Sequence, residues 1–241
     1  MMTMSEHTLY FKVDGLTLSG ILHLPDQPPR ALIVGVHGLM SDKNSPKQIA
    51  LAKRLTSIKM AYLRFDHRGC GDSEGDFNEQ TTMENRRSDL LAAIQAAQHM
   101  VGKTIPVGLF GSSLGGTICL TAAKQMNPFA MVTLAAPVQS RSIQLPTDSP
   151  ESLKSEIVGR RLTFNIKEMI DNVHHILILH GSVDETVPAE NADTIYRLST
   201  QPKQKIVLEN GDHRVSNPEH QQYFIETAAR WFETCYQAQS R

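Results

Sequence analysis

The first part of the chain alternates apolar and polar residues, a pattern typical of strands that expose one face to water. Residues 8–13 and 16–24 show this alternation on either side of Asp14-Gly15. An Asp-Gly pair favours the tight turn of a hairpin, because both residues tolerate the backbone conformation that such a turn requires. We therefore expect an antiparallel hairpin at the start of the chain.

From residue 31 onward, short continuous apolar runs alternate with segments of helical spacing. The expected strands are residues 31–36, 61–65, 105–110, 129–135, 176–179 and 205–208. The expected helices are residues 48–58, 81–100, 114–126, 189–198 and 219–236. Such alternation is typical of strands buried between helices. The predicted fold class is α/β, with a mostly parallel eight-stranded sheet flanked by helices and the hairpin as its antiparallel edge.

Local signals mark some boundaries of these elements. Thr81 and Glu84 have the spacing of a capping box at the start of the second expected helix. Residues 138–173 break the alternation, because they are too many for a plain connection between a strand and a helix. In this segment Ser149-Pro150 is typical of a helix start and Gly159 of a helix end.

We interpret residues 138–173 as a small cap insertion in a single domain that spans residues 1–241. The cap is expected to lie over one end of the sheet. Its apolar residues are the ones that we expect to line the space beneath it: Leu145, Leu153, Ile157, Leu162, Phe164 and Ile166.

Composition excludes several classes of protein. The 241 residues are 40% apolar and 20% charged, as in ordinary globular domains, and the formal net charge is −1. Basic residues are dispersed, so neither nucleic acid nor an anionic membrane surface is an expected partner. No apolar run approaches the roughly 18 residues of a membrane-spanning helix, and the N-terminus lacks the pattern of a signal peptide.

Three cysteines, Cys70, Cys119 and Cys235, are an odd number at spacings that match no metal motif. Three free thiols in a reducing compartment are the simplest interpretation, and we expect a cytoplasmic location. No metal ion and no cofactor is expected. The sequence does not indicate an oligomeric state.

The pentapeptide Gly111-Ser112-Ser113-Leu114-Gly115 fits the pattern G-x-S-x-G between an expected strand and an expected helix. A sharp turn at this point holds the central serine exposed at the carboxyl end of the sheet. The helix N-terminus behind it offers N–H groups to a developing oxyanion. Ser113 is therefore the predicted nucleophile, since Ser112 does not have glycines two residues away on both sides.

A serine nucleophile needs a base, and the chain has ten histidines. His213 follows the last expected strand, which places it at the same end of the sheet as Ser113. Of the competing histidines, His7 and His23 lie in the hairpin, His99 and His220 belong to helices, and His174 and His175 precede a strand. His180 is expected to shape the loop that follows it. His213 is therefore the predicted base.

An acid is needed to orient the imidazole of His213. Asp184 lies a few residues beyond the strand at 176–179, again at the carboxyl end of the sheet. Glu185 is its solvated neighbour and Asp193 lies on the following helix, so both are weaker candidates. Asp184 is the predicted acid.

The order Ser113, Asp184, His213 resembles that of the α/β-hydrolase family. His37-Gly38 resembles the oxyanion loop of this family. The stretch from Asp66 to Ser73, DHRGCGDS, resembles the D-x-R-G-x-G-x-S signature of its serine aminopeptidase-like and cinnamoyl-esterase-like branch.

This resemblance implies the α/β-hydrolase fold and an oxyanion hole made by the backbone N–H groups of Leu39 and Leu114. It also implies structural roles for Asp66 and Arg68, which would fix the loop that contains them.

Function is expected to be hydrolysis of carboxylic esters with small to medium acyl or aryl groups, through an acyl-enzyme on Ser113. The partner is then a small-molecule ester. A peptidase or thioesterase would use the same triad, and an aminopeptidase would need an acidic group for the substrate amine, for which Glu151 and Glu156 are the only suggestions. A non-catalytic scaffold is the alternative of a different class.

Overall fold

The computed structural model describes residues 4–145, 147, 149, 151, 153–154 and 161–239. It contains one eight-stranded sheet in the order β1-β2-β4-β3-β5-β6-β7-β8. The pairs β1–β2 and β2–β4 are antiparallel and all other pairs are parallel. The predicted α/β class and mostly parallel sheet are thereby confirmed.

The elements alternate along the chain much as the apolar pattern predicts. The strands are β1 Ser5–Val13, β2 Leu16–Leu24, β3 Ala31–Val36, β4 Met60–Phe65, β5 Val107–Ser112, β6 Met131–Leu134, β7 Ile176–Gly181 and β8 Lys203–Leu208. The main helices are α1 Pro46–Thr56, α3 Met83–Val101, α4 Leu114–Met126, α5 Glu190–Leu198 and α6 Pro218–Gln239. The turn between β1 and β2 has positive φ at both Asp14 and Gly15, as the hairpin signal requires.

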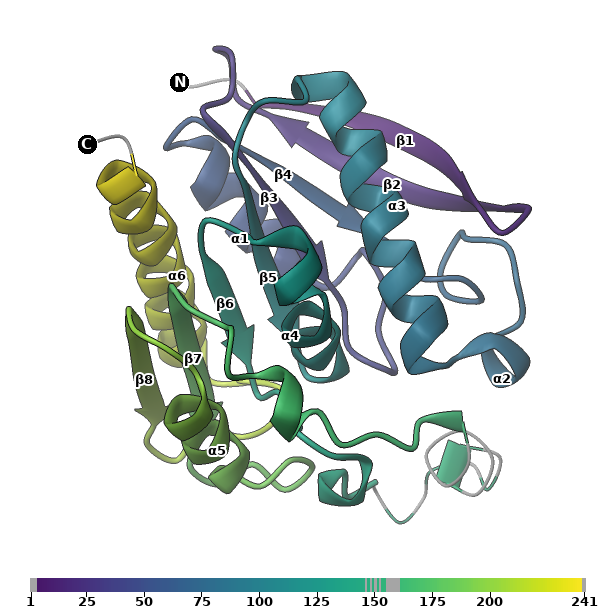
Figure 1. Cartoon of the computed structure of the whole chain (residues 1–241), viewed down its shortest axis with the longest axis vertical. Coiled ribbons are helices and arrows are strands. Elements are labelled where there is room, and N and C mark those ends of the chain that lie inside the picture. Colours follow the sequence, from purple (N-terminus) through teal and green to yellow (C-terminus); the bar gives the residue numbers. More distant parts are fainter. Residues whose placement is uncertain are drawn as a thin grey trace.

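Helices cover both faces of the sheet, and each face has its own apolar core. In Figure 1, α3 and α4 lie in front of the sheet and α1 lies behind it. Along β3, Leu32, Val34 and Val36 join the core beneath α3, α4 and α5, whereas Ala31 and Ile33 join the core beneath α1 and α6. This two-sided burial explains why the central strands read as continuous apolar runs.

The predicted capping box at Thr81 and Glu84 is wrong by one residue. Thr82 is the N-cap of α3, and its hydroxyl accepts a hydrogen bond from the N–H of Asn85. Thr81 instead ends the short helix α2, Phe77–Gln80, and is buried. The sequence pattern does not reveal α2, which shifts the start of α3 by two residues from that expected.

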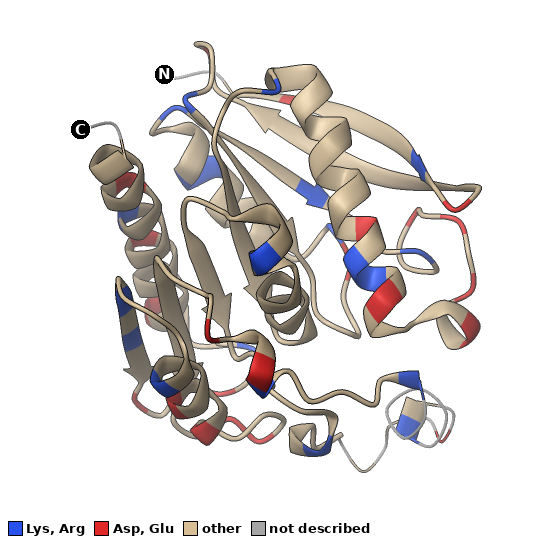
Figure 2. Cartoon of the chain, in the orientation of Figure 1, with Lys and Arg blue, Asp and Glu red and all other residues tan. Residues whose placement is uncertain are grey.

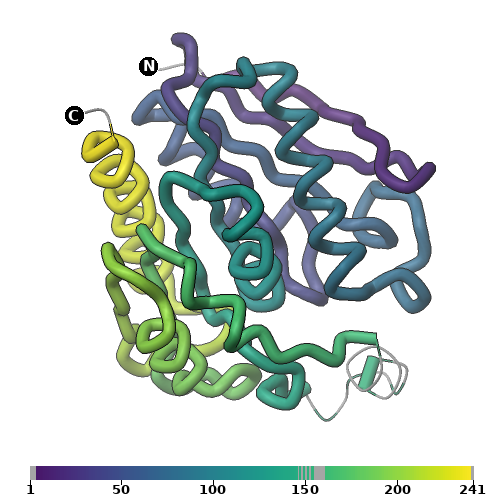
Figure 3. Tube along the Cα trace, in the orientation of Figure 1, coloured from purple at the N-terminus to yellow at the C-terminus, as the bar shows by residue number. Residues whose placement is uncertain are grey.

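The described parts of the segment 138–173 lie past the carboxyl ends of β5 and β6, as the tube in Figure 3 makes visible. A bridge between Gln139 and Asn165 closes its two ends on each other, and Leu153 and Leu162 are buried against Leu39 and Leu114. Pro150, Ile157 and Gly159, on which part of the expected cap helix depends, lie outside the described residues. That the segment acts as a cap on a single domain stays a prediction.

Charged residues of both signs are interspersed over the helices in view in Figure 2, in keeping with the near-neutral formal charge of −1. No helix among the described residues is long and apolar enough to cross a membrane.

Candidate active site

Ser113 lies at the sharp turn between β5 and α4. Its backbone has φ 54° and ψ −128°, a conformation that residues other than glycine rarely adopt. The N–H of Ser113 donates a 2.7 Å hydrogen bond to the carbonyl oxygen of Leu134. A Cβ atom on Gly115 would lie 2.2 Å from the carbonyl oxygen of Val36, and one on Gly111 would lie 2.4 Å from that of Gly115. Glycine is therefore required at both positions for the strand and helix to approach this closely.

Loops from two other strands bring His213 and Asp184 to Ser113, as the sequence predicts. His213 Nε2 lies 3.1 Å from Ser113 Oγ, and His213 Nδ1 lies 2.8 Å from Asp184 Oδ2. Because a carboxylate accepts at Nδ1, that nitrogen carries the proton and Nε2 is free to accept from the serine hydroxyl. The three side chains thus form one hydrogen-bonded chain, whose catalytic roles stay predictions.

The carboxylate of Asp184 is held by several donors. Its Oδ1 accepts hydrogen bonds from the N–H groups of Thr186 at 2.9 Å and Val187 at 2.7 Å. Burial alone raises the pKa of Asp184, but hydrogen bonds from His180, His213 and the Val187 N–H outweigh it and hold the pKa well below its usual range. Asp184 is therefore ionised whenever the protein is folded near neutral pH.

His180 takes a part in this site that the sequence interpretation missed. It lies within β7, fully buried, with Nε2 2.7 Å from the carbonyl oxygen of Val187 and 3.2 Å from Asp184 Oδ2. Its position four residues before Asp184 is the signal that could have indicated the contact, because a tight turn separates them. His180 orients the carboxylate that in turn orients His213.

The candidate oxyanion loop lies against the serine. A Cβ atom on Gly38 would lie 3.3 Å from Ser113 Cβ, so the loop and the serine are in direct contact. Among the described residues, neither the N–H of Leu39 nor that of Leu114 donates a backbone hydrogen bond. Both groups are therefore free to act as donors, as the resemblance implies.

Two buried side chains hold the carbonyl groups of this loop. His37 Nδ1 lies 2.7 Å from the carbonyl oxygen of Gly38. The guanidinium of Arg86 lies 3.5 Å from the same oxygen and 3.4 Å from that of Leu39. These contacts hold the two carbonyl groups against buried side chains. Because the N–H of Leu39 points opposite to the Gly38 carbonyl of the same peptide group, it is directed away from His37 and Arg86.

The signature from Asp66 to Ser73 packs behind the loop and takes the structural place expected of it. Asp66 accepts hydrogen bonds from the backbone and side chain of Lys43 at 2.6 and 2.5 Å. Arg68 pairs with the buried carboxylate of Asp89 at 2.7 Å, and His67 Nδ1 lies 3.2 Å from the same carboxylate. None of these groups reaches Ser113, so their effect on the site is to fix its supporting loops.

His67 makes the stability of this support depend on pH. Burial, together with the charge of Arg86, lowers the pKa of His67 from 6.5 to about 4, although Asp89 opposes the shift. The unfolded chain therefore binds more protons between these values, and the stabilisation, complete above pH 6.5, is lost as the pH falls through about 4. We expect His67→Gln to remove on the order of 1–3 kcal/mol of this loss, as measured by urea unfolding across the window.

His99 provides the control for this measurement, because its side chain is exposed on the surface of α3. His99→Gln should keep the pH dependence of the native protein. A His67→Gln variant with the native pH dependence would show that His67 is not the linked group.

A pocket of about 710 Å³ opens at Ser113 and His213. Leu39 and Leu114 line it together with Ile143, Leu145 and Leu153 from the segment 138–173. Leu145 and Leu153 were expected to line it. The expectation is wrong for Ile166, which belongs to the core beneath α4, and Leu162 and Phe164 pack behind the lining. Ile157 and Glu156 lie outside the described residues.

Lys47, Gln48 and Arg214 also line the pocket and were missed by the sequence interpretation. Asp193, the weaker candidate acid, instead pairs with Lys205 on the surface of α5. All three cysteines are free, as expected, and the structure also buries all three. Within the described part of the chain, no group of three or more His, Cys, Asp or Glu residues is placed to hold a metal ion.

Known proteins resemble the chain in sequence. The uncharacterised protein YfhR of Salmonella typhi is 29% identical over 195 residues, which cover 76% of this chain and 64% of YfhR, so the match spans less than two thirds of that relative. The palmitoyl-protein thioesterase ABHD10 of Bos taurus is 26% identical over 224 residues, covering 81% of this chain and 71% of the relative.

Similarity in structure covers nearly the whole chain. Est1E from Butyrivibrio proteoclasticus, solved with bound ferulic acid, has a TM-score of 0.80 at 21% identity and covers 94% of this chain and 98% of its own. At this identity the likeness shows the α/β-hydrolase fold.

The sequence also matches a family model described as serine aminopeptidase, S33, over residues 27–163. The match includes Ser113 and the stretch from Asp66 to Ser73 but ends before Asp184 and His213. It covers more than half of the chain. The chain therefore belongs to the serine aminopeptidase, S33, family of hydrolases, with the α/β-hydrolase fold.

Proposed function

We propose that this protein hydrolyses carboxylic esters of small to medium acyl or aryl groups through an acyl-enzyme on Ser113. The observation that carries the proposal is the unbroken chain of hydrogen bonds from Ser113 Oγ through His213 to Asp184, at 3.1 and 2.8 Å, at the mouth of a 710 Å³ pocket. An activated serine beside a pocket of this size suits an acyl group that enters with its carbonyl at Ser113.

The reaction has two stages. His213 Nε2 takes the hydroxyl proton as Ser113 Oγ bonds to the ester carbonyl carbon, and the N–H groups of Leu39 and Leu114 stabilise the oxyanion. The carbon–oxygen bond to the alcohol breaks, and the alcohol leaves with the proton from His213. Water, activated by His213, then attacks the acyl carbon and releases the acid and Ser113. Asp184 stabilises the imidazolium in both stages.

Thioester cleavage is the second candidate, because the relative ABHD10 is named a thioesterase and the triad suits both bonds. An aminopeptidase is disfavoured, since no Asp or Glu is among the described lining residues. A scaffold role is disfavoured because the triad is complete in residues and in hydrogen bonds. A cytoplasmic location is part of the proposal and is supported by three free cysteines.

Hydrolysis of p-nitrophenyl esters from acetate to laurate tests the proposal. We expect a rate optimum at short to medium acyl length, with the acyl group packed against Leu145 and Leu153 in the apolar part of the lining. Peptide and acyl-thioester panels measured beside the series separate the alternatives. Peptide cleavage without ester cleavage would overturn the proposal, and an optimum at laurate would overturn its claim on acyl size.

A further inference from the structure

The lining of the pocket has two chemically different parts. One is apolar: Leu39, Leu114 and Leu153 belong to a single buried cluster, with Leu145 packed against it. The other is polar and is centred on Lys47 at the start of α1 and Arg214, the residue that follows His213. Lys47 Nζ donates a 2.8 Å hydrogen bond to the carbonyl oxygen of Arg214, so the two residues lie side by side.

The two cations have no direct ion-pair partner within the described structure. Neither Lys47 nor Arg214 forms a salt bridge with a described residue, and the Arg214 guanidinium donates no hydrogen bond there. The carboxylates whose charges act on Lys47 are those of Asp212 and Asp184. Asp212 accepts a hydrogen bond from the N–H of Ser216, and Asp184 is hydrogen-bonded to His213. Burial lowers the pKa of Lys47 in spite of these carboxylates.

Further donors lie at the start of α1, next to Lys47 in the chain. Gln48 is 1% exposed and lines the pocket. Its amide oxygen accepts from the Tyr62 hydroxyl, and its amide nitrogen has no partner among the described residues. The helix α1 begins here with Ser45 and Pro46, without a side-chain cap. The N–H of Lys47 also has no partner in the described part of the chain, and the positive end of the helix dipole favours an anion.

Resting on the esterase function proposed above, we infer that the substrate carries an anionic oxygen group, held by Lys47 and Arg214, in addition to its apolar part. Two cations, an unpaired amide and a helix N-terminus form a site that supplies donors, and no Asp or Glu is among the described residues that line it. A neutral ester would offer these donors no charged partner. A carboxylate on the substrate would pair with them through charge-assisted hydrogen bonds. The leucine cluster takes the remainder of the molecule.

Two pairs of esters test this inference, with a carboxylate as the anionic probe. Mono-p-nitrophenyl adipate against p-nitrophenyl hexanoate places the charge in the acyl part. The butyrate ester of 4-hydroxybenzoate against phenyl butyrate places it in the leaving group. We expect kcat/KM to favour the anionic member of one pair by about tenfold or more at low salt, and to favour it less as salt is added.

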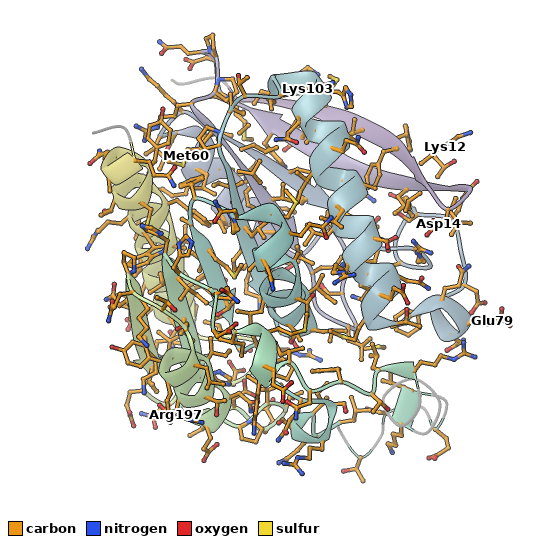
Figure 4. All side chains as sticks on the ribbon, in the orientation of Figure 1. Lys12, Asp14, Met60, Glu79, Lys103 and Arg197 are labelled. Carbon is orange, nitrogen blue, oxygen red and sulfur yellow. The ribbon has the colours of Figure 1, made fainter. Side chains whose placement is uncertain are left out.

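The ratio of kcat/KM within each pair is the readout for the variants. Lys47→Met and Arg214→Met should each bring the favoured ratio at least several-fold closer to one. Lys103→Met and Arg197→Met are matched controls on exposed residues outside the pocket lining, both labelled in Figure 4, and should keep the native ratio. Arg214→Met removes the charge of the side chain but keeps the backbone carbonyl oxygen that accepts the hydrogen bond from Lys47. This variant therefore separates the effect of the Arg214 charge from the effect of losing support for the loop that carries His213.

Failure of this inference differs from failure of the esterase function. Hydrolysis of the neutral esters without preference for an anionic member overturns the inference alone. A preference that both Lys47→Met and Arg214→Met leave unchanged overturns it as well. Absence of hydrolysis of every ester by the native protein overturns the esterase function and this inference with it.

Discussion

Ser113→Ala is expected to lower kcat for ester hydrolysis by about 10⁴- to 10⁶-fold, the cost found when the nucleophile of other triad enzymes is removed. The reason is that Ser113 Oγ is the group that His213 Nε2 contacts, at 3.1 Å, and no other nucleophile takes its place at the turn. KM should change far less, because the pocket lining is otherwise intact. Steady-state rates on the best ester of the p-nitrophenyl series provide the measurement.

The neighbouring Ser112 is the matched control. It lies at the end of β5 and also lines the pocket, yet it has no hydrogen bond to His213 among those described. Ser112→Ala should cost far less than Ser113→Ala. A double variant, Ser113→Ala with His213→Ala, should be no slower than either single variant, since the two groups act as one unit. Full activity in Ser113→Ala would contradict the assignment.

Asp184→Asn is expected to lower kcat by about 10⁴-fold, as the corresponding change does in serine proteases. The amide of asparagine can donate to His213 Nδ1, which stabilises the tautomer of His213 that carries its proton on Nε2. In that tautomer Nε2 cannot accept the hydroxyl proton of Ser113. The carboxylate also stabilises the imidazolium that forms as Ser113 loses its proton. The loss should persist on both sides of neutral pH, because the depressed pKa of Asp184 keeps its carboxylate ionised there in the native protein.

The neighbour Glu185 is exposed and serves as the control for this change. Glu185→Gln should retain activity close to that of the native protein, because no contact joins its side chain to His213 among those described. If Glu185→Gln were the slower of the two variants, Asp184 would not be the orienting acid.

The parts of the site that depend on local geometry could be predicted from the sequence. The glycines at 111 and 115 mark the turn at Ser113, because a Cβ atom at either would collide with backbone. Asp184 and His213 each follow a strand, and parallel strands end at one edge of the sheet, so their loops had to meet there. The start of α3 was misplaced because two threonines stand side by side and only the backbone decides which one caps the helix.

The parts that depend on contacts distant in the chain could not be predicted. Lys47 and Arg214 are 167 positions apart, and the packing of α1 beside the His213 loop brings them together. Likewise, Arg86 supports the carbonyls of Gly38 and Leu39 from a helix 47 to 48 residues further along.

Covalent labelling with a fluorophosphonate tests the central claim most directly, because the reagent needs an activated serine and no knowledge of the substrate. The account predicts that the intact protein is labelled once, that the adduct maps to Ser113, and that both Ser113→Ala and prior unfolding abolish it. An adduct on another residue, or no labelling of intact protein, would contradict the assignment of Ser113 as the nucleophile of a serine hydrolase.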